Sequence, residues 1–554
     1  MTMSSNSMHA IEETDAHKGK YLPRGGIQQH PDRGHLRTIY ASVLFTLLLF
    51  GGITFIFGTF HKVSYPFGWD DDEGAVWWEA AHVTNLRILY HPIQQYPYFV
   101  VPYPPVFHAV TWLASRGTGD FLIAGRLICV FSALGISLLF ALLVWHASPQ
   151  RIPVLIRGSG AVLGSLLCFR LDSLGLYIPE MGVDLLALFF TFLGVYLFIR
   201  GGQRPIVLCG AFTCFVLAVF TKQTMVAAPL ACLAACTLIN PGKAVRYFLF
   251  CVSLGVAGLG YLVWASGGEV LKSLFLYNAS QPFSIRHAVR GMQINLEGML
   301  PIAIVACMAM LPLIRQTACI KRSSYLCWLR WVLESSLYRR ALFVLGLELI
   351  LALLTSLTYG KMGSGVHYFL EWNLLCCPLA GLLFVRVLDS WRPFARYSKR
   401  AVAVLLLVLL TALTGLPAAL RHIDSVYRFS DGERKTQSAL YSSSEEALKV
   451  LEQTPGPALS DNLLLLMKAH KEIPIEPGIQ TYLGKASIWD QSGFVKMITS
   501  QTFGVIVMRT LDNGFWTDEI VQAIKMNYVA TEQIGDENVG ECHYTVYRPR
   551  RWQF

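Results

Sequence analysis

The sequence has few charged residues for its length. Asp, Glu, Lys and Arg make up 15% of the 554 residues, whereas 54% are hydrophobic, and the mean hydropathy is +0.45. Soluble globular domains usually contain about 25% charged residues. The composition therefore excludes a large soluble protein and predicts a chain that is embedded in a membrane.

The sequence also lacks the spacings that hold metals or disulfides. It has 13 cysteines but no CxxC pair and no Cys/His cluster with zinc-ligand spacing. Most of the cysteines lie inside apolar runs, where a thiol behaves as a small buried hydrophobe. The net charge of +10 comes from short Lys and Arg clusters between apolar runs, the pattern of topology signals. We expect no structural zinc, no disulfides and no nucleic-acid partner.

Apolar runs long enough to cross a membrane recur along the chain. A span needs about 20 mostly apolar residues to cross roughly 30 Å of hydrocarbon. The expected spans, about eleven, are 40–60, 121–145, 153–169, 177–199, 205–220, 225–239, 247–266, 298–314, 341–357, 368–385 and 401–420. The first run is too long for a signal peptide and is followed by no cleavage site, so we interpret it as an uncleaved anchor.

Lys and Arg alternate between the two sides of these spans. They cluster in the N-terminal tail and in every second loop, which the positive-inside rule places on the inner side. We therefore expect an all-α membrane fold with the N-terminus inside and a small α/β domain outside. The predicted parts are an inner tail (1–38), a transmembrane domain (39–420) with a first outer loop (61–120), and an outer domain (421–554) that alternates helical and β-rich segments.

The first outer loop opens with a run of carboxylates. Asp70, Asp71, Asp72 and Glu73 are adjacent and follow the first span closely. Such a cluster is tolerated when it is solvated, binds a cation, or contains a carboxyl with a raised pKa that suits a general base. A hydrated acidic loop is the alternative to a functional site. Mg²⁺ or Mn²⁺ is a candidate ligand of this run, and no other cofactor is expected.

Aromatic residues and prolines follow in the same loop. They include His91, Tyr96 and Tyr103, which stand in His-Pro, Tyr-Pro and Tyr-Pro-Pro sequences. Aromatic residues often serve only as anchors at the membrane surface. Because prolines stiffen the backbone between them, we instead expect a rigid, shaped surface that binds a substrate.

These features together resemble a known family. An inner N-terminus, a first outer loop that opens with an Asp-Glu pair and closes on a Tyr-Pro-Pro segment, a Lys-Gln turn (221–224) and a Gly-rich segment before a late span (360–371) are similar to the C-type (GT-C) glycosyltransferase fold. Its members include protein O-mannosyltransferases, aminoarabinose transferases of lipid A and lipopolysaccharide-core transferases. The resemblance covers residues 40–420, and it favours a bacterial inner membrane.

The resemblance implies an inverting glycosyltransferase. The donor would be a polyprenyl-phosphate sugar in the outer leaflet, and the acceptor a lipid, a glycan or a protein. Asp72 would be the catalytic base, with Asp70 and Asp71 as rivals, and Glu73 would orient the base or the acceptor. The phosphate of the leaving group needs fixed cations or donors. The candidates for that role are Lys222, Lys361, Arg286 and His367.

The expected substrate-binding residues are Asp70, His91, Tyr96, Tyr103 and Glu371. For each cation a topology-setting or snorkelling side chain is the alternative, except Lys361, whose neighbouring glycines allow close approach to a phosphate. Asp184 lies within a predicted span, and we expect it to be paired inside the bundle.

Two other functions remain open. A transporter or flippase would place binding groups at the membrane midplane and often repeats its halves. The sequence has no clear internal repeat, and its unusual polar residues gather at one face. The second alternative is a scaffold or sensor whose outer domain binds a ligand. Retained function in Asp72→Asn and Asp71→Asn would favour either of them.

Overall fold

The computed structural model describes residues 32–69, 72–202, 204–318, 325–390, 431–509, 511, 514–535 and 543–550. The chain divides into two compact units, Met1–Tyr40 and Ala41–Phe554, and the second contains the helical bundle and the sheet. The acidic residues Asp70 and Asp71 and the predicted span 401–420 lie outside the described residues.

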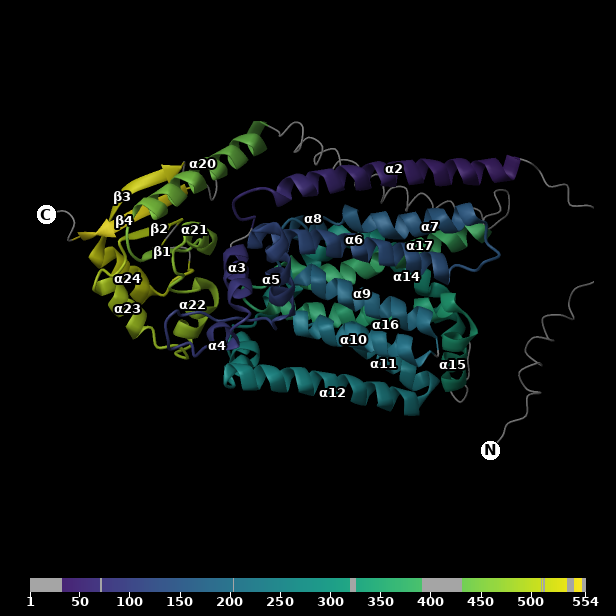
Figure 1. Ribbon diagram of the computed structural model, residues 1–554. Helices are drawn as coiled ribbons and strands as arrows, with labels where there is room; N and C mark the ends of the chain where they lie inside the picture. Colours follow the sequence, from purple (N-terminus) through teal and green to yellow (C-terminus); the bar gives the residue numbers. More distant parts are fainter. Residues whose placement is uncertain are drawn as a thin grey trace, which may run out of the picture. The chain divides into compact units, whose positions relative to one another are not determined.

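Helices predominate in the described part of the compact unit, and the longest of them are apolar (Figure 1). Among the described residues, seven segments are long and apolar enough to cross a membrane: Ser42–Phe60, Phe121–Ala147, Asp184–Gly201, Pro241–Ser266, Ile285–Gln316, Leu337–Gly360 and Val366–Ser390. They belong to α2 (Asp32–Val63), α6 (Phe121–Ala147), α9 (Asp184–Gly201), α12 (Pro241–Ser266), α14 (Ile285–Ala318), α16 (Leu337–Ser356) and α17 (Leu370–Ser390). Two shorter apolar helices are α10 (Pro205–Thr221) and α11 (Ala227–Ile239), and α7 (Val154–Leu166) is a further short helix.

The first ten predicted spans all coincide with these helices. Three of them fall on helices of 13 to 17 residues, shorter than a span normally needs. Pro205 begins α10, and α11 ends at the Asn240 cap, where Pro241 begins the next helix. The fold class of a helical bundle with apolar spans is therefore confirmed, but the number of eleven spans is not.

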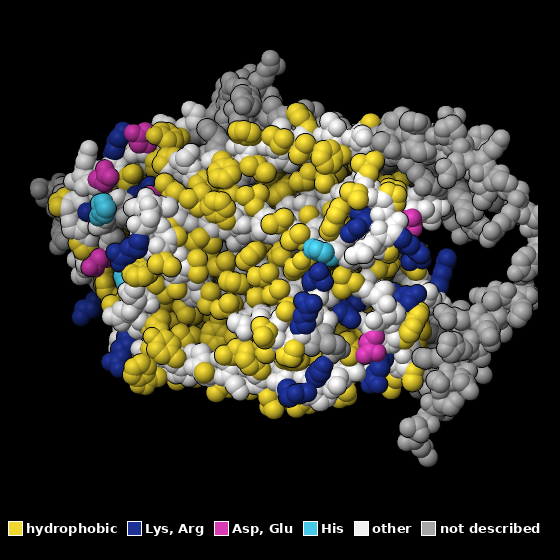
Figure 2. Space-filling model, turned by 45° about the vertical axis from the view of Figure 1, so that its right-hand side comes forward, with side chains coloured by type: hydrophobic (Ala, Val, Ile, Leu, Met, Phe, Trp, Pro, Cys, Tyr) yellow, Lys and Arg dark blue, Asp and Glu magenta, His cyan; other side chains and the backbone are white. Residues whose placement is uncertain are grey.

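Helix α17 lies at the centre of the bundle, and 94% of its most apolar stretch is buried inside the protein. It packs against α7 and α14, while α9 packs against α6 and α10. Glycines allow the α7–α17 contact, because a Cβ at Gly160 or Gly381 would meet the backbone of the facing helix. Helix α12 is the opposite case, because only 6% of its apolar stretch is buried and it lies at the edge of the bundle. Figure 2 shows the broad apolar surface of the helices, with Lys and Arg gathered toward its ends.

The C-terminal part contains a four-stranded mixed sheet with strand order β1-β2-β4-β3. Strands β1 (Ala458–Ser460) and β2 (Val505–Met508) are parallel, and β4 (His543–Pro549) is antiparallel to β2 and to β3 (Tyr528–Gly535). The helices of this part are α20 (Asp431–Gln453), α21 (Leu463–Lys468), α22 (Pro477–Lys485), α23 (Ser492–Thr499) and α24 (Asp518–Asn527). The expected small α/β arrangement is present, and its predicted start at 421 lies outside the described residues.

The first outer loop folds between the long helices and this sheet (Figure 1). It forms α3 (Asp72–His82), α4 (Leu86–Leu89) and α5 (Val106–Thr118). Trp78 and Phe99 of the loop share one buried cluster with Leu465 and Val505 of the C-terminal part. The Tyr98 backbone pairs with Ile475 in a parallel bridge. The loop and the C-terminal part therefore share one core.

Candidate functional site

The carboxylate run ends in a buried ion pair. Glu73 is 1% exposed, and its two oxygens accept bonds from Arg126 Nε at 2.8 Å and Nη2 at 2.7 Å. The backbone N–H groups of Trp69 and Met181 donate to the same oxygens, each at 2.8 Å. Four donors therefore occupy the two oxygens of Glu73. The geometry supports a role in positioning the run.

Arg126 ties the start of the loop to α6. Its guanidinium also donates to the carbonyl oxygens of Tyr65 at 2.5 Å and Phe67 at 2.7 Å. Arg126 is 0% exposed. The segment that leads from α2 to α3 is thus held against α6 by one side chain, and this fixes where α3 begins.

Asp72 is the first residue of α3, and it is exposed. The charge of Asp72 helps to raise the pKa of Glu79, which lies about two turns further along α3, and the pKa of Tyr103. Asp72 therefore lies near both side chains. Among the described residues of the carboxylate run, it is the one with its side chain at the surface, whereas Glu73 is buried.

A lysine–aspartate pair lies where α9 begins and α10 ends. Lys222 Nζ is 2.5 Å from Asp184 Oδ1, and the side chains are 2% and 11% exposed. The pairing expected for Asp184 is confirmed, and its partner is one of the predicted phosphate ligands. The ammonium also lies 5.7 Å from the centre of the Tyr103 ring and 5.0 Å from that of Tyr368. Aromatic faces at this distance stabilise a cation.

Lys361 follows α16 in the Gly-rich segment. Its Nζ donates to Asn278 Oδ1, and Asn278 Nδ2 donates to the Pro102 carbonyl at 3.3 Å. Gln223 Nε2 donates to the same carbonyl at 2.9 Å. Residues far apart in the sequence thus converge on Pro102 of the first outer loop. Gly363 has φ +79°, a left-handed conformation that favours glycine and turns the chain after Lys361.

Lys361 has no carboxylate within ion-pair distance among the described residues. Burial and the positive charge of Lys222 lower the pKa of Lys361 from its usual 10.5 to about 8. The two ammonium groups therefore repel each other, and a bound anion would relieve that repulsion. His367 completes this group, because its electrostatic partners are Lys222 and Asp184 and its ring centre lies 5.5 Å from that of Tyr177.

Glu79 is a second buried acid on α3, the helix that Asp72 begins. Glu79 Oε2 is 3.3 Å from His108 Nε2, and both side chains are almost fully buried. Burial, Asp72 and Glu476 raise the pKa of Glu79 well above its usual range, and burial lowers the pKa of His108 to about 3. Burial thus favours the neutral form of both side chains. Burial also raises the pKa of Glu476 to about 7.

The remaining predicted residues lie apart from this group or are engaged in structural contacts. Arg286 is exposed on α14. Both ring nitrogens of His91 contact carbonyl oxygens of the loop itself, those of Ile88 and Pro97. Tyr96 donates to Glu472 of the C-terminal part at 3.1 Å. Glu371 is 5% exposed within α17, and its charge acts on the buried Glu348 of α16.

Four residues of the site were not assigned from the sequence: Tyr368, Asn278, Glu79 and His108. Tyr368 directly follows the predicted His367, and Asn278 stands outside any charged motif. The described residues contain no group of three or more His, Cys, Asp or Glu side chains that could hold a metal ion, and Asp70 and Asp71 are not among them. A divalent cation at the carboxylate run stays a prediction.

The fold is similar to that of solved structures. ArnT from Cupriavidus metallidurans bound to undecaprenyl phosphate matches with a TM-score of 0.57 and 12% identity, covering 90% of this chain and 97% of that one. Its apo state matches with a TM-score of 0.55, 12% identity and coverage of 91% and 97%. An Archaeoglobus fulgidus oligosaccharyltransferase gives a TM-score of 0.49 at 12% identity, over 93% of this chain and 75% of that one.

No protein-family model matches the sequence. No curated protein matches it by sequence either. The likeness is therefore one of fold: over about 90% of its length, the chain shares the architecture of ArnT. This agrees with the resemblance of its sequence motifs to the GT-C fold.

Proposed function

We propose that the protein is a membrane glycosyltransferase that moves a sugar from a polyprenyl-phosphate donor to an acceptor hydroxyl. The observation that carries the proposal is the shared architecture with ArnT, whose structure holds undecaprenyl phosphate, together with the two lysines gathered at one end of the bundle. We call this the lysine end; it bears Asp72, Lys222 and Lys361.

The reaction follows from what these groups can do. Asp72 takes the proton of the acceptor hydroxyl as that oxygen attacks the anomeric carbon of the sugar. The new C–O bond forms on the face opposite the phosphate, so the configuration inverts. The bond from the anomeric carbon to the phosphate oxygen breaks, and the polyprenyl phosphate leaves with the electron pair.

The leaving phosphate gains negative charge, and fixed cations stabilise it. Lys361 is the principal candidate because it has no carboxylate partner among the described residues and already lies in the field of a second cation. Lys222 is held by Asp184 and flanked by Tyr103 and Tyr368, so it contributes a preorganised positive charge. His367 lies beside this pair and orients the phosphate.

A two-part assay tests the proposal. The purified full-length protein is incubated with a panel of radiolabelled polyprenyl-phosphate sugars, and released or transferred sugar is measured. We expect turnover of at least one donor in the wild type and loss of turnover in Asp72→Asn. A transporter or flippase would bind the donor and leave the sugar–phosphate bond intact, which would contradict the proposal.

A further inference from the structure

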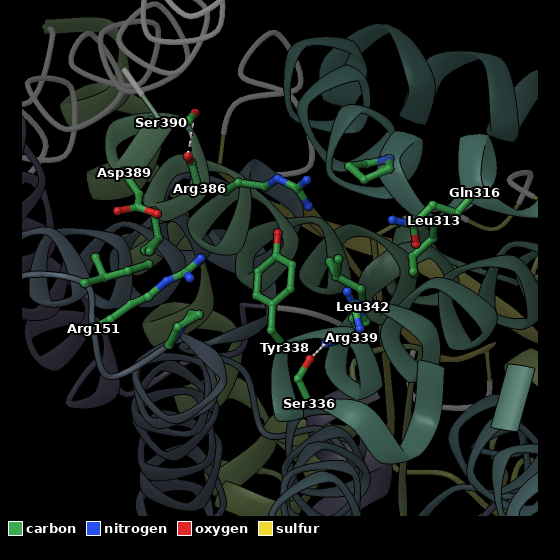
Figure 3. Close-up of a pocket in the computed structure, with 14 residues that line it drawn as sticks. Arg151, Leu313, Gln316, Ser336, Tyr338, Arg339, Leu342, Arg386, Asp389 and Ser390 are labelled. Atoms are coloured by element: carbon green, nitrogen blue, oxygen red, sulfur yellow. Dashed lines mark hydrogen bonds between the residues drawn. The ribbon is translucent and has the colours of Figure 1, made fainter. Parts of the chain in front are cut away.

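The opposite end of the bundle carries a cavity of about 590 Å³ (Figure 3). Four parts of the chain line it: the turn after α6, the end of α14, the beginning of α16 and the end of α17. Helix α16 connects the two ends, since it begins at this cavity and ends just before Lys361. Its 20 residues span about 30 Å at 1.5 Å per residue, close to the hydrocarbon thickness of a membrane.

Three arginines from three of these elements line the cavity. They are Arg151 from the turn, Arg339 from α16 and Arg386 from α17, and Asp389 is the one acidic lining residue. No carboxylate of the described residues lies within ion-pair distance of the three guanidinium groups. The lining therefore carries an excess of positive charge that an anion can neutralise.

Polar groups of the same lining are placed to receive that anion. Figure 3 shows the Tyr338 ring between the arginines, with its hydroxyl turned toward Arg386. The Tyr338 hydroxyl oxygen is buried, and the Arg386 guanidinium lies 6.0 Å from the centre of the Tyr338 ring. Arg339 stacks on Trp331 at 3.9 Å and donates to Ser335 at 3.0 Å, so its position is fixed.

Apolar surface adjoins the cavity. Pro149, Ile152, Leu313 and Leu342 contribute to its lining, and the chain just beyond Ile152 exposes Val154 at 68% and Leu155 at 48%. Side chains this exposed on an apolar helix face acyl chains in a membrane. A soluble anion needs the arginines alone, whereas a lipid would use both the arginines and this flank.

We propose that this cavity binds the phosphate-bearing headgroup of an anionic phospholipid, with Arg151, Arg339, Arg386 and Tyr338 as its ligands. Guanidinium groups bind phosphate through two parallel hydrogen bonds, and basic pockets between spanning helices are suited to anionic headgroups. The arginines thus do more than set topology: they hold a lipid where four elements of the bundle meet. This inference does not depend on the proposed transfer reaction.

Native mass spectrometry of the full-length protein in detergent tests it, with short-chain phosphatidylglycerol as the probe. The variant Arg151→Gln/Arg386→Gln removes two cavity arginines. Its matched control is Arg200→Gln/Arg204→Gln, which removes two exposed arginines near the start of α10. We expect the cavity variant to bind the lipid at least about tenfold more weakly and the control to bind as the wild type does. Equal losses in the two variants would overturn the proposal.

Two further arms identify the ligand. Short-chain phosphatidylcholine, which carries phosphate but no net charge, should bind more weakly than phosphatidylglycerol, and inorganic phosphate in excess should not displace the lipid. Displacement by inorganic phosphate would overturn the lipid assignment. If the double variant unfolds, Arg386→Lys keeps the charge and removes the paired hydrogen bonds, and it should still lose severalfold affinity; unchanged affinity there would also count against the cavity.

Discussion

The two ends of the helical bundle differ in how their charged side chains are paired. At the lysine end, Glu73 pairs with Arg126 and Asp184 pairs with Lys222, at 2.7 and 2.5 Å and almost out of contact with solvent. At the other end, Arg151 and Arg386 are exposed and have no carboxylate partner among the described residues. Buried pairs fix geometry, because removing one partner leaves an uncompensated charge. Exposed arginines leave the geometry free and attract an anion.

The largest difference between the ends should appear in the rate of reaction. Asp72→Asn removes the proton acceptor and keeps the size of the side chain, so we expect sugar transfer to fall by about 10²–10⁴ while donor binding is retained. Arg204→Gln, at an exposed arginine just before α10 and outside both proposed sites, should leave the rate unchanged. Equal losses in Asp70→Asn, Asp71→Asn and Asp72→Asn that Mn²⁺ restores would instead indicate a shared cation site. Full activity in Asp72→Asn would remove Asp72 from the mechanism.

The second contrast concerns stability. Glu73→Gln breaks the buried pair with Arg126 and leaves a charged guanidinium in the core, which costs about 3–5 kcal/mol. The thermal unfolding midpoint in detergent should therefore fall strongly. Glu445→Gln is the matched control, because its pair with Lys449 is 44% and 60% exposed and contributes less than about 1 kcal/mol. Similar midpoints for the two variants would show that the Glu73 pair does not hold the loop.

A third contrast lies in donor affinity and its dependence on pH. Lys361→Ala should weaken donor binding about ten- to a hundredfold, the effect of losing one charge-assisted contact. Because the pKa of Lys361 is lowered to about 8, its ammonium is present below that pH and is lost as the pH rises through it. Wild-type affinity should therefore decline above pH 8, and Lys361→Arg should not show that decline. Lys272→Ala, an exposed lysine, is the control. A flat wild-type profile would contradict the assignment.

The fourth prediction concerns which side of the membrane each end of the bundle faces, and it requires the smallest change to the protein. A cysteine at Lys449, which is exposed on α20, should react with an impermeant thiol reagent in intact cells. The native Cys327 is exposed on α15, at the end of the bundle that carries the cavity, and should react only after the cells are opened. The reverse pattern would place the lysine end inside and refute the predicted orientation.

The helices could be predicted because each depends on a local property. An apolar run of about 20 residues in a membrane forms a helix because its backbone groups must be hydrogen-bonded within the run, and the first ten predicted runs overlap helices. The partners of charged residues depend on the tertiary fold instead. Glu73 lies 53 residues from Arg126, and Lys361 lies 83 residues from Asn278. The sequence predicts that Asp184 needs a partner in the membrane, but not that the partner is Lys222.

The C-terminal part shows the same limit. Its alternation of helices and strands is local and was predicted, as in α24 and β2. Its shared core with the first outer loop was not, because the contacts join residues almost 400 positions apart. Gln94 of the loop donates to the carbonyl of Ile488 at 3.1 Å, and Tyr98 pairs with Ile475. His91 and Tyr96 were predicted to bind substrate, whereas the hydrogen bonds of His91 hold the loop together and that of Tyr96 attaches it to the C-terminal part.

The most direct test of the account is donor turnover measured in proteoliposomes. The wild-type protein is reconstituted with a polyprenyl-phosphate sugar that carries a label on the sugar and a second label on the lipid. The account predicts that the sugar label separates from the lipid label in the wild type and stays with it in Asp72→Asn, although both proteins bind the donor. Movement of both labels together across the bilayer, with the sugar–phosphate bond intact, would contradict it.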